Sequence, residues 1–94
     1  MTTTNPNNSY TVTTMDSTDV YNYLKRKARK DSNSDIDCLA EAIIASYGDD
    51  TDISTQELKA VCACGSLSVL DYREMQCHVT TSMRTVSLSE AHVD

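Results

Sequence analysis

The stretch YGDDTDISTQEL, residues 47–58, combines acidic side chains with a signal for the start of a helix. Three aspartates precede Ser54 and Glu57, which form the S-x-x-E pattern of a capping box. Calcium takes oxygen ligands from acidic loops of this kind, and a glutamate on the next helix can supply two of them. Acidic residues at a helix start are equally explained by the positive end of the helix dipole. Two interpretations of the loop, a metal site and a polar turn, therefore stay open.

Cysteine and histidine supply a second kind of metal ligand. Cys62, Cys64, Cys77 and His78 are of the types that bind zinc, which would suit a small domain. Cys62 and Cys64 lie two positions apart on a predicted helix, so their side chains point to different faces, and the familiar C-x-x-C spacing is absent. We therefore expect these cysteines to be small apolar side chains packed in the interior.

The elements that must position these residues are predicted to be mainly helices. Apolar residues recur at helical spacing most clearly between Ile36 and Tyr47, before Gly48 ends the pattern. Val69, Tyr72, Met75 and Val79 are expected on one face of the last helix. We expect helices at 17–30 capped by Asp16 or Ser17, at 34–47 capped by Ser34, at 55–64 capped by Ser54, and from Ser66 or Ser68 to 77, then a short strand at 84–88.

The first fifteen residues differ from the rest. They are rich in Thr and Asn, and Tyr10 and Val12 alternate with Thr, which is typical of an extended arm or an edge strand. A chain of 94 residues makes one domain at most. We therefore predict an extended arm at 1–15 and a single mainly α domain at 16–94, a small four-helix bundle with a short strand.

Charge is distributed unevenly along the chain. The net charge is -6, and twelve of the fourteen acidic residues follow residue 30. The basic run KRKARK could contact phosphates, but it has no interleaved Gly or aromatic residue and lies beside an acidic body, which argues against nucleic acid as a partner. Docking on an acidic partner, or on the chain's own acidic surface, explains the run as well. The residues predicted to bind a protein partner are Tyr10, Val12, Lys25, Arg26, Lys27, Arg29 and Lys30.

In its helix-loop-helix setting, YGDDTDISTQE resembles an EF-hand, and more closely the first hand of calpain-type penta-EF proteins, whose loop has eleven residues. The resemblance implies that the four helices form an EF-hand-like bundle, and an irregular bundle is the alternative. The resemblance implies that Ile53 pairs with Val86 of a second loop, VTTSMRTVSLSE at 79–90, which lacks every acidic ligand except Glu90. The calcium ligands that it implies are the Tyr47 backbone carbonyl, the Asp50 and Asp52 side chains, and bidentate Glu57.

A weaker resemblance concerns the same helices. The segment DIDCLAEAIIASYGD is similar to the catalytic-cysteine segment of ovarian-tumour-type cysteine proteases. It implies Cys38 as a nucleophile at a helix N-terminus and His92 as its base. The Gly-Asn that precedes the cysteine in that family is replaced here by Ile36-Asp37, so we expect Cys38 to be a buried structural residue instead.

Together these features predict a non-catalytic protein-interaction module, a regulator, inhibitor or assembly subunit that uses an acidic helical surface and the N-terminal arm. A second copy of the chain is one alternative for the partner. A calcium-binding module is the second function to test and a cysteine hydrolase the third, and we expect no other cofactor. No export signal and no apolar run long enough to span a membrane are visible, so a cytoplasmic protein with reduced thiols and no membrane partner is expected, of the kind found among viral or accessory proteins.

Overall fold

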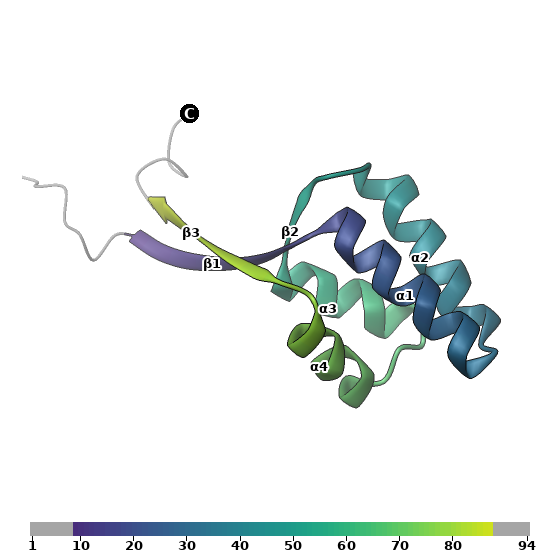
Figure 1. Cartoon of the computed structure of the whole chain (residues 1–94). Coiled ribbons are helices and arrows are strands. Elements are labelled where there is room, and N and C mark those ends of the chain that lie inside the picture. The colour runs from purple at the N-terminus through teal and green to yellow at the C-terminus, as the bar shows by residue number, and fades with distance from the viewer. Residues whose placement is uncertain (1–8, 88–94) are drawn as a thin grey trace, which may run out of the picture.

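The structure is a computed structural model, and it describes residues 9–87. Within that part the chain forms four helices and a three-stranded antiparallel sheet, so the prediction of a mainly helical protein is confirmed (Figure 1). The elements in chain order are β1 (Ser9–Asp16), α1 (Ser17–Asp31), α2 (Ser34–Tyr47), β2 (Asp52–Ser54), α3 (Thr55–Cys64), α4 (Val69–His78) and β3 (Thr81–Ser87).

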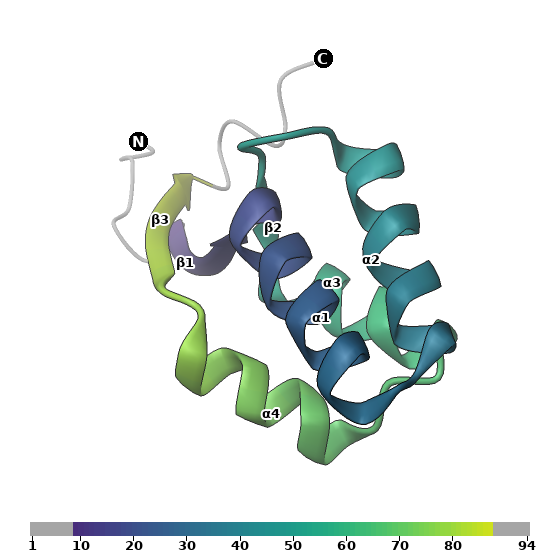
Figure 2. The same cartoon turned by 45° about the vertical axis from the view of Figure 1, so that its right-hand side comes forward.

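Helices α1 and α2 form an antiparallel pair on one side of the molecule (Figures 1 and 2). Asp16 caps α1 by accepting hydrogen bonds from the backbone N–H groups of Thr18 and Asp19, at 3.1 and 3.2 Å. The cap of α2 is Asn33 and not the predicted Ser34, because the Asn33 side chain accepts from the first free N–H groups of the helix. The two helices bury their apolar stripes against each other, namely Val20, Leu24 and Ala28 with Ile36, Leu39, Ala40 and Ile43.

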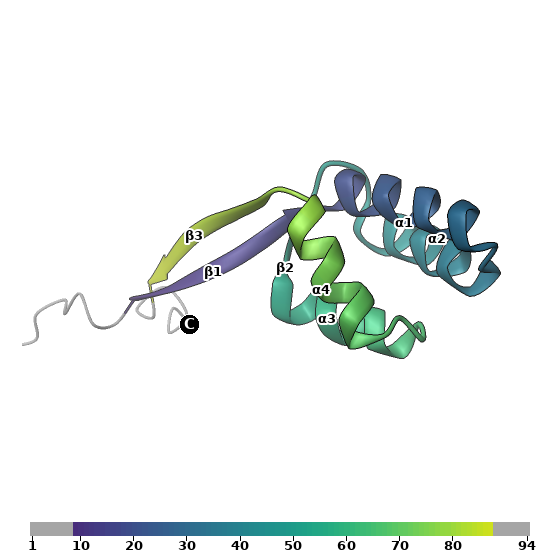
Figure 3. The ribbon, with the colours of Figure 1, turned by 60° about the horizontal axis from the view of Figure 1, so that its bottom comes forward.

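Helices α3 and α4 lie on the other side of the helical body (Figure 3). Ser54 and Ser68 cap them by accepting from the N–H groups of Glu57 and Asp71, at 3.1 and 3.0 Å. They contribute Leu58, Cys62, Tyr72 and Met75 to the core. Val69, predicted on the same face as Tyr72 and Met75, does not join them in the core, since it lies in the first turn of α4 and is 54% exposed.

The sheet was predicted only in part. Its strand order is β2-β1-β3, so β1 is the central strand where β2 pairs with it, at Thr14–Asp16, and has only β3 as a partner further out. Strand β3 begins earlier than the predicted 84, and β2 was not predicted. Residues 1–8 of the predicted arm lie outside the described residues. Strand β1 therefore has a long partner on one side and a short one on the other.

The strands β1 and β3 form a ribbon that projects from the helices (Figures 1 and 3). Only the base of the ribbon belongs to the core, where Met15 of β1 and Ile53 of β2 are opposite each other and almost fully buried. Further out, Tyr10 pairs with Val86, and Tyr10 is 46% exposed. The helical body thus acts as a scaffold that holds one end of a two-stranded ribbon.

Candidate functional site

The free edge of β1 is a backbone surface that the described part of the fold leaves open for binding. Strand β1 pairs with β3 from Ser9 to Met15, but with β2 only from Thr14 to Asp16. Among residues 9–87, no strand covers the β2-side edge of β1 between Tyr10 and Thr13. A groove of about 290 Å³ lies alongside it and is lined by Tyr10, Thr11, Val12, Thr13, Ser54, Thr55 and Gln56. None of these lining residues is charged, although charged residues make up 23% of the chain.

The backbone groups that face this groove follow from the pairing with β2. The Ser17 N–H donates to the Thr51 carbonyl at 2.8 Å, so the backbone of Ser17 faces the β2 side. Successive residues of a strand present their N–H and C=O groups to opposite edges. The alternation therefore places the N–H and C=O groups of Thr11 and Thr13 toward the groove, and those of Val12 toward β3. These groups are the donors and acceptors that an added strand requires.

The acidic loop between α2 and α3 is held by hydrogen bonds within the chain. The Ser17 hydroxyl donates to the Gly48 carbonyl at 2.6 Å and accepts from the Thr51 N–H at 2.9 Å. The Thr51 hydroxyl donates to the Tyr47 carbonyl at 2.8 Å, and the Tyr47 hydroxyl donates to the Glu57 carboxylate. The last bond raises the pKa of Tyr47 above its ordinary value. Tyr47 and Glu57 are therefore brought together, but through the tyrosine side chain.

The other two predicted calcium ligands lie elsewhere in the same loop. The Asp50 N–H donates to the Thr18 hydroxyl at 2.9 Å, and Asp52 pairs with Asp16 across β2 and β1. In the described part of the chain, no three His, Cys, Asp or Glu side chains lie together in a way that could hold a metal ion. Calcium binding at this loop stays a prediction.

The strand pairing expected from the EF-hand resemblance is wrong. Ile53 is opposite Met15, and Val86 is opposite Tyr10. Both pair with β1, which lies between β2 and β3, so the two loops do not meet through these residues. Glu90, the closing residue of the second loop, lies outside the described residues.

The cysteines differ in exposure. Cys62 is buried as expected, and burial raises the pKa of its thiol to about 12, so it stays protonated at neutral pH. Cys38, Cys64 and Cys77 are exposed, so the expectation that they pack in the interior is wrong. They lie on α2, α3 and α4, with their side chains exposed and outside the buried core. His92, the base implied for Cys38, lies outside the described residues, so the proposed pair stays a prediction.

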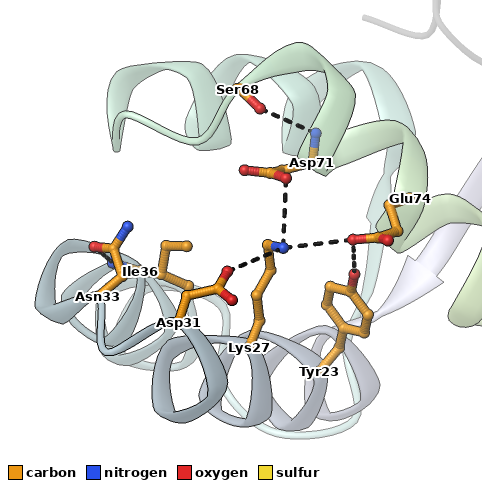
Figure 4. A network of polar contacts seen from close by, with 8 residues as sticks. All are labelled: Tyr23, Lys27, Asp31, Asn33, Ile36, Ser68, Asp71 and Glu74. Carbon is orange, nitrogen blue, oxygen red and sulfur yellow. Dashed lines mark hydrogen bonds and ion pairs between the residues drawn. The ribbon is translucent and has the colours of Figure 1, made fainter.

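Two of the five predicted partner-binding cations form ion pairs within the chain. Lys25 contacts Asp37 and Glu41 of α2, both at 2.8 Å. Lys27 contacts Asp31, Asp71 and Glu74 at 3.3, 3.4 and 3.4 Å, and Figure 4 shows its ammonium group between the three carboxylates. Within residues 9–87, the exposed Arg26, Arg29 and Lys30 form no ion pair.

A larger hollow lies between α1 and α4, with a volume of about 510 Å³. His78 stacks on Tyr23 in its wall, with the ring centroids 5.9 Å apart. Its lining residues are Tyr23, Arg26, Lys27, Lys30, Glu74 and His78. Because Asp31, Asp71 and Glu74 surround Lys27, charges of both signs meet here, and the hollow favours neither an anion nor a cation.

Replacement of Lys27 by Met tests how firmly this network holds α4 against α1. Burial alone would lower the pKa of Lys27, but hydrogen bonds to Asp31 and Asp71 and the carboxylate charges outweigh it and raise the pKa above its usual 10.5. Since Met keeps the apolar stem but removes the charge, we expect the free energy of unfolding to fall by about 1–2 kcal/mol in urea titrations at neutral pH.

The control is Lys59→Met on the exposed face of α3, which is expected to change stability by less than about 0.5 kcal/mol. The pKa of Lys27 is higher in the folded state than in the unfolded state. Its contribution to the free energy of unfolding is therefore complete below the unfolded-state pKa and is lost as the pH rises from there through the folded-state pKa. The difference between wild type and Lys27→Met should therefore be constant through neutral pH and shrink in alkaline solution. Equal effects of the two substitutions would show that the network does not stabilise the fold.

Comparison of the chain with family models, curated proteins and solved structures finds no match. Among the described residues, no helix is both long enough and apolar enough to cross a membrane. The features of the described residues that bear on function are therefore the free edge of β1, the charge networks and the grooves.

Proposed function

We propose that this protein is a non-catalytic interaction module that binds an extended segment of a protein partner by adding it as a strand to the free edge of β1. The observation that carries the proposal is the uncovered edge between Tyr10 and Thr13, with the groove beside it. Thr11 and Thr13 supply main-chain donors and acceptors, and the helical body supplies the rigid support.

The energetics of the ribbon support this proposal. An isolated two-stranded antiparallel ribbon is marginally stable in water, whereas a third strand adds a second ladder of hydrogen bonds. The outer part of β1 and β3 has no helix beneath it to provide apolar burial (Figure 3). An added strand would therefore stabilise the part of the molecule that has the fewest contacts of its own.

The charge of the binding edge limits the class of partner. The groove contains hydroxyl, amide and apolar groups and no ionised side chain. A partner segment rich in Thr, Ser or Val fits it, because such residues favour strands and do not leave a charge without a partner. The acidic surface supports an inhibitor role less well, since Asp37, Glu41 and the carboxylates around Lys27 already pair within the chain.

A blocked synthetic heptapeptide of alternating Thr and Val tests the proposal directly. Added to dilute protein, it should slow amide hydrogen exchange of Thr11 and Thr13 at least about tenfold, because their N–H groups face the groove. The Val12 amide already faces β3, so its exchange should slow much less than that of Thr11 and Thr13, and it serves as the internal comparison. The same peptide N-methylated at consecutive central residues should have no effect. An equal slowing of exchange at all amides, or an unchanged exchange rate at Thr11, would contradict strand addition at this edge.

Two proline substitutions provide the matched test in the protein. Thr11→Pro removes an N–H that faces the groove, and proline is tolerated in a strand when its missing donor faces the uncovered edge. Val12→Pro removes an N–H that faces β3 and should disrupt the ribbon. We therefore expect Thr11→Pro to lose peptide binding with the ribbon intact, and Val12→Pro to lose both.

A further inference from the structure

We infer that the segment that adds to this edge is strand β1 of a second copy of the chain, so that the protein forms a two-fold symmetric dimer with Thr11 facing Thr11. This inference rests on strand addition at β1, and it names the partner. The dimer would contain an intermolecular sheet in the order β3-β1-β1-β3, with the two copies of β1 antiparallel.

The direction of the backbone groups determines the register. In an antiparallel pair, a residue whose N–H and C=O groups point to the partner strand lies opposite a residue whose N–H and C=O groups point back to it. Thr11 has this orientation, so a two-fold axis at Thr11 lets its N–H and C=O bond to those of Thr11 of the second copy. The same register places Tyr10 opposite Val12 of the second copy. Pairs of an aromatic and a β-branched side chain are favourable across antiparallel strands.

Charge distinguishes this edge from the outer edge of β3. The sequence from Ser9 to Met15 has no ionisable group except the Tyr10 hydroxyl. Strand β3 also presents an edge that is uncovered within residues 9–87, but Arg84 lies at its centre. A two-fold pairing of β3 about its centre would place two arginines directly opposite each other, which is destabilising. Self-pairing is therefore expected at β1 and disfavoured at β3.

The shape of the protomer makes the dimer compatible with its charge. Each chain has a net charge of -6, so two copies repel each other at close range. All four described helices lie at one end of the ribbon (Figures 1 and 3). Antiparallel overlap of the outer ribbons places the two helical bodies at opposite ends of the dimer, where solvent screens their repulsion. Ser54 of β2 pairs with Thr14 and closes the groove there, so the ladder of hydrogen bonds between the two copies of β1 is short. Because a short ladder contributes little binding energy, the dimer should dissociate on dilution.

Opposite charges at Thr11 test both the dimer and its register. Sedimentation velocity of the wild-type chain from micromolar to millimolar concentration should show a reversible monomer–dimer equilibrium. Thr11→Glu and Thr11→Lys should each weaken the dimer by at least about fivefold, since like charges would face each other across the axis. An equimolar mixture of the two variants should restore dimerisation, because the charges are then opposite.

Thr85 provides the matched control. It lies beside Thr11 on the same face of the ribbon but on β3, away from the axis. Thr85→Glu and Thr85→Lys should leave the dimer nearly unchanged, with no gain on mixing. A wild-type chain that stays monomeric, or a dimer that is insensitive to charge at Thr11, would overturn the inference. If the chain stays monomeric but the Thr-Val heptapeptide still protects the Thr11 amide, strand addition holds and only the second copy is wrong as the partner.

Discussion

Replacement of Leu24 by Ala is expected to lower the free energy of unfolding by about 2–5 kcal/mol. Leu24 lies in the middle of α1, is 0% exposed, and belongs to the core between the two helix pairs. The substitution removes buried methyl groups and leaves a cavity that the surrounding helices cannot fully close. Urea titration followed by circular dichroism measures the change, and a marginally stable small domain would lose most of its folded population.

Leu70 offers the matched control for this experiment. It lies in the first turn of α4 and is 75% exposed, so Leu70→Ala should change stability by less than about 0.5 kcal/mol. If both leucines gave the same small change, the placement of α1 at the centre of the core would be incorrect.

Replacement of Ser17 by Ala is the second large effect, an expected loss of about 1–3 kcal/mol. Ser17 is fully buried, and its hydroxyl joins the first turn of α1 to the Gly48 carbonyl and the Thr51 N–H. Alanine would leave these two groups without a hydrogen bond in a partly buried position. Thermal or urea unfolding measures the loss, and faster amide exchange at Thr51 would locate it in the loop.

Ser46 is the control for Ser17, because it is exposed on α2 and alanine is the better helix former. Ser46→Ala should leave stability unchanged or raise it by a few tenths of a kcal/mol. A neutral result for Ser17→Ala, or unchanged exchange at Thr51, would mean that the loop is held by its other contacts.

Local signals in the sequence were sufficient to predict the helices. A cap and an apolar stripe are properties of neighbouring residues, so Ser54 was predicted as a cap, and Asp16 and Ser68 were each one of two predicted alternatives. The one wrong cap, Ser34 in place of Asn33, arose because two adjacent residues are both good caps. Val69 was misplaced because α4 is short and its apolar stripe is weak.

The sheet could not be predicted in the same way. Strand β2 has only three residues, Asp-Ile-Ser, and its last residue is also the N-cap of α3. From the sequence alone, this segment was therefore assigned to the turn before α3. Its pairing depends on β1, which lies far upstream in the chain. The free edge could not be predicted for the same reason. It exists only where β2 is too short to cover β1, and the sequence did not indicate that these two distant segments pair. Tyr10 and Val12 were predicted as binding residues from their alternation with Thr, but which edge is uncovered had to come from the structure.

The pairing of β1 with β3 also has a consequence for the order in which the protein folds. Among the described elements, β1 leaves the ribosome first and β3 last, and every helix lies between them. The local contacts of α1 and α2 can form early, but joining β1 to β3 requires closing a long segment of chain, which costs conformational entropy. During synthesis, the edge of β1 that faces β3 therefore stays without its partner until residues 81–87 have been made, and the ribbon can be completed only then.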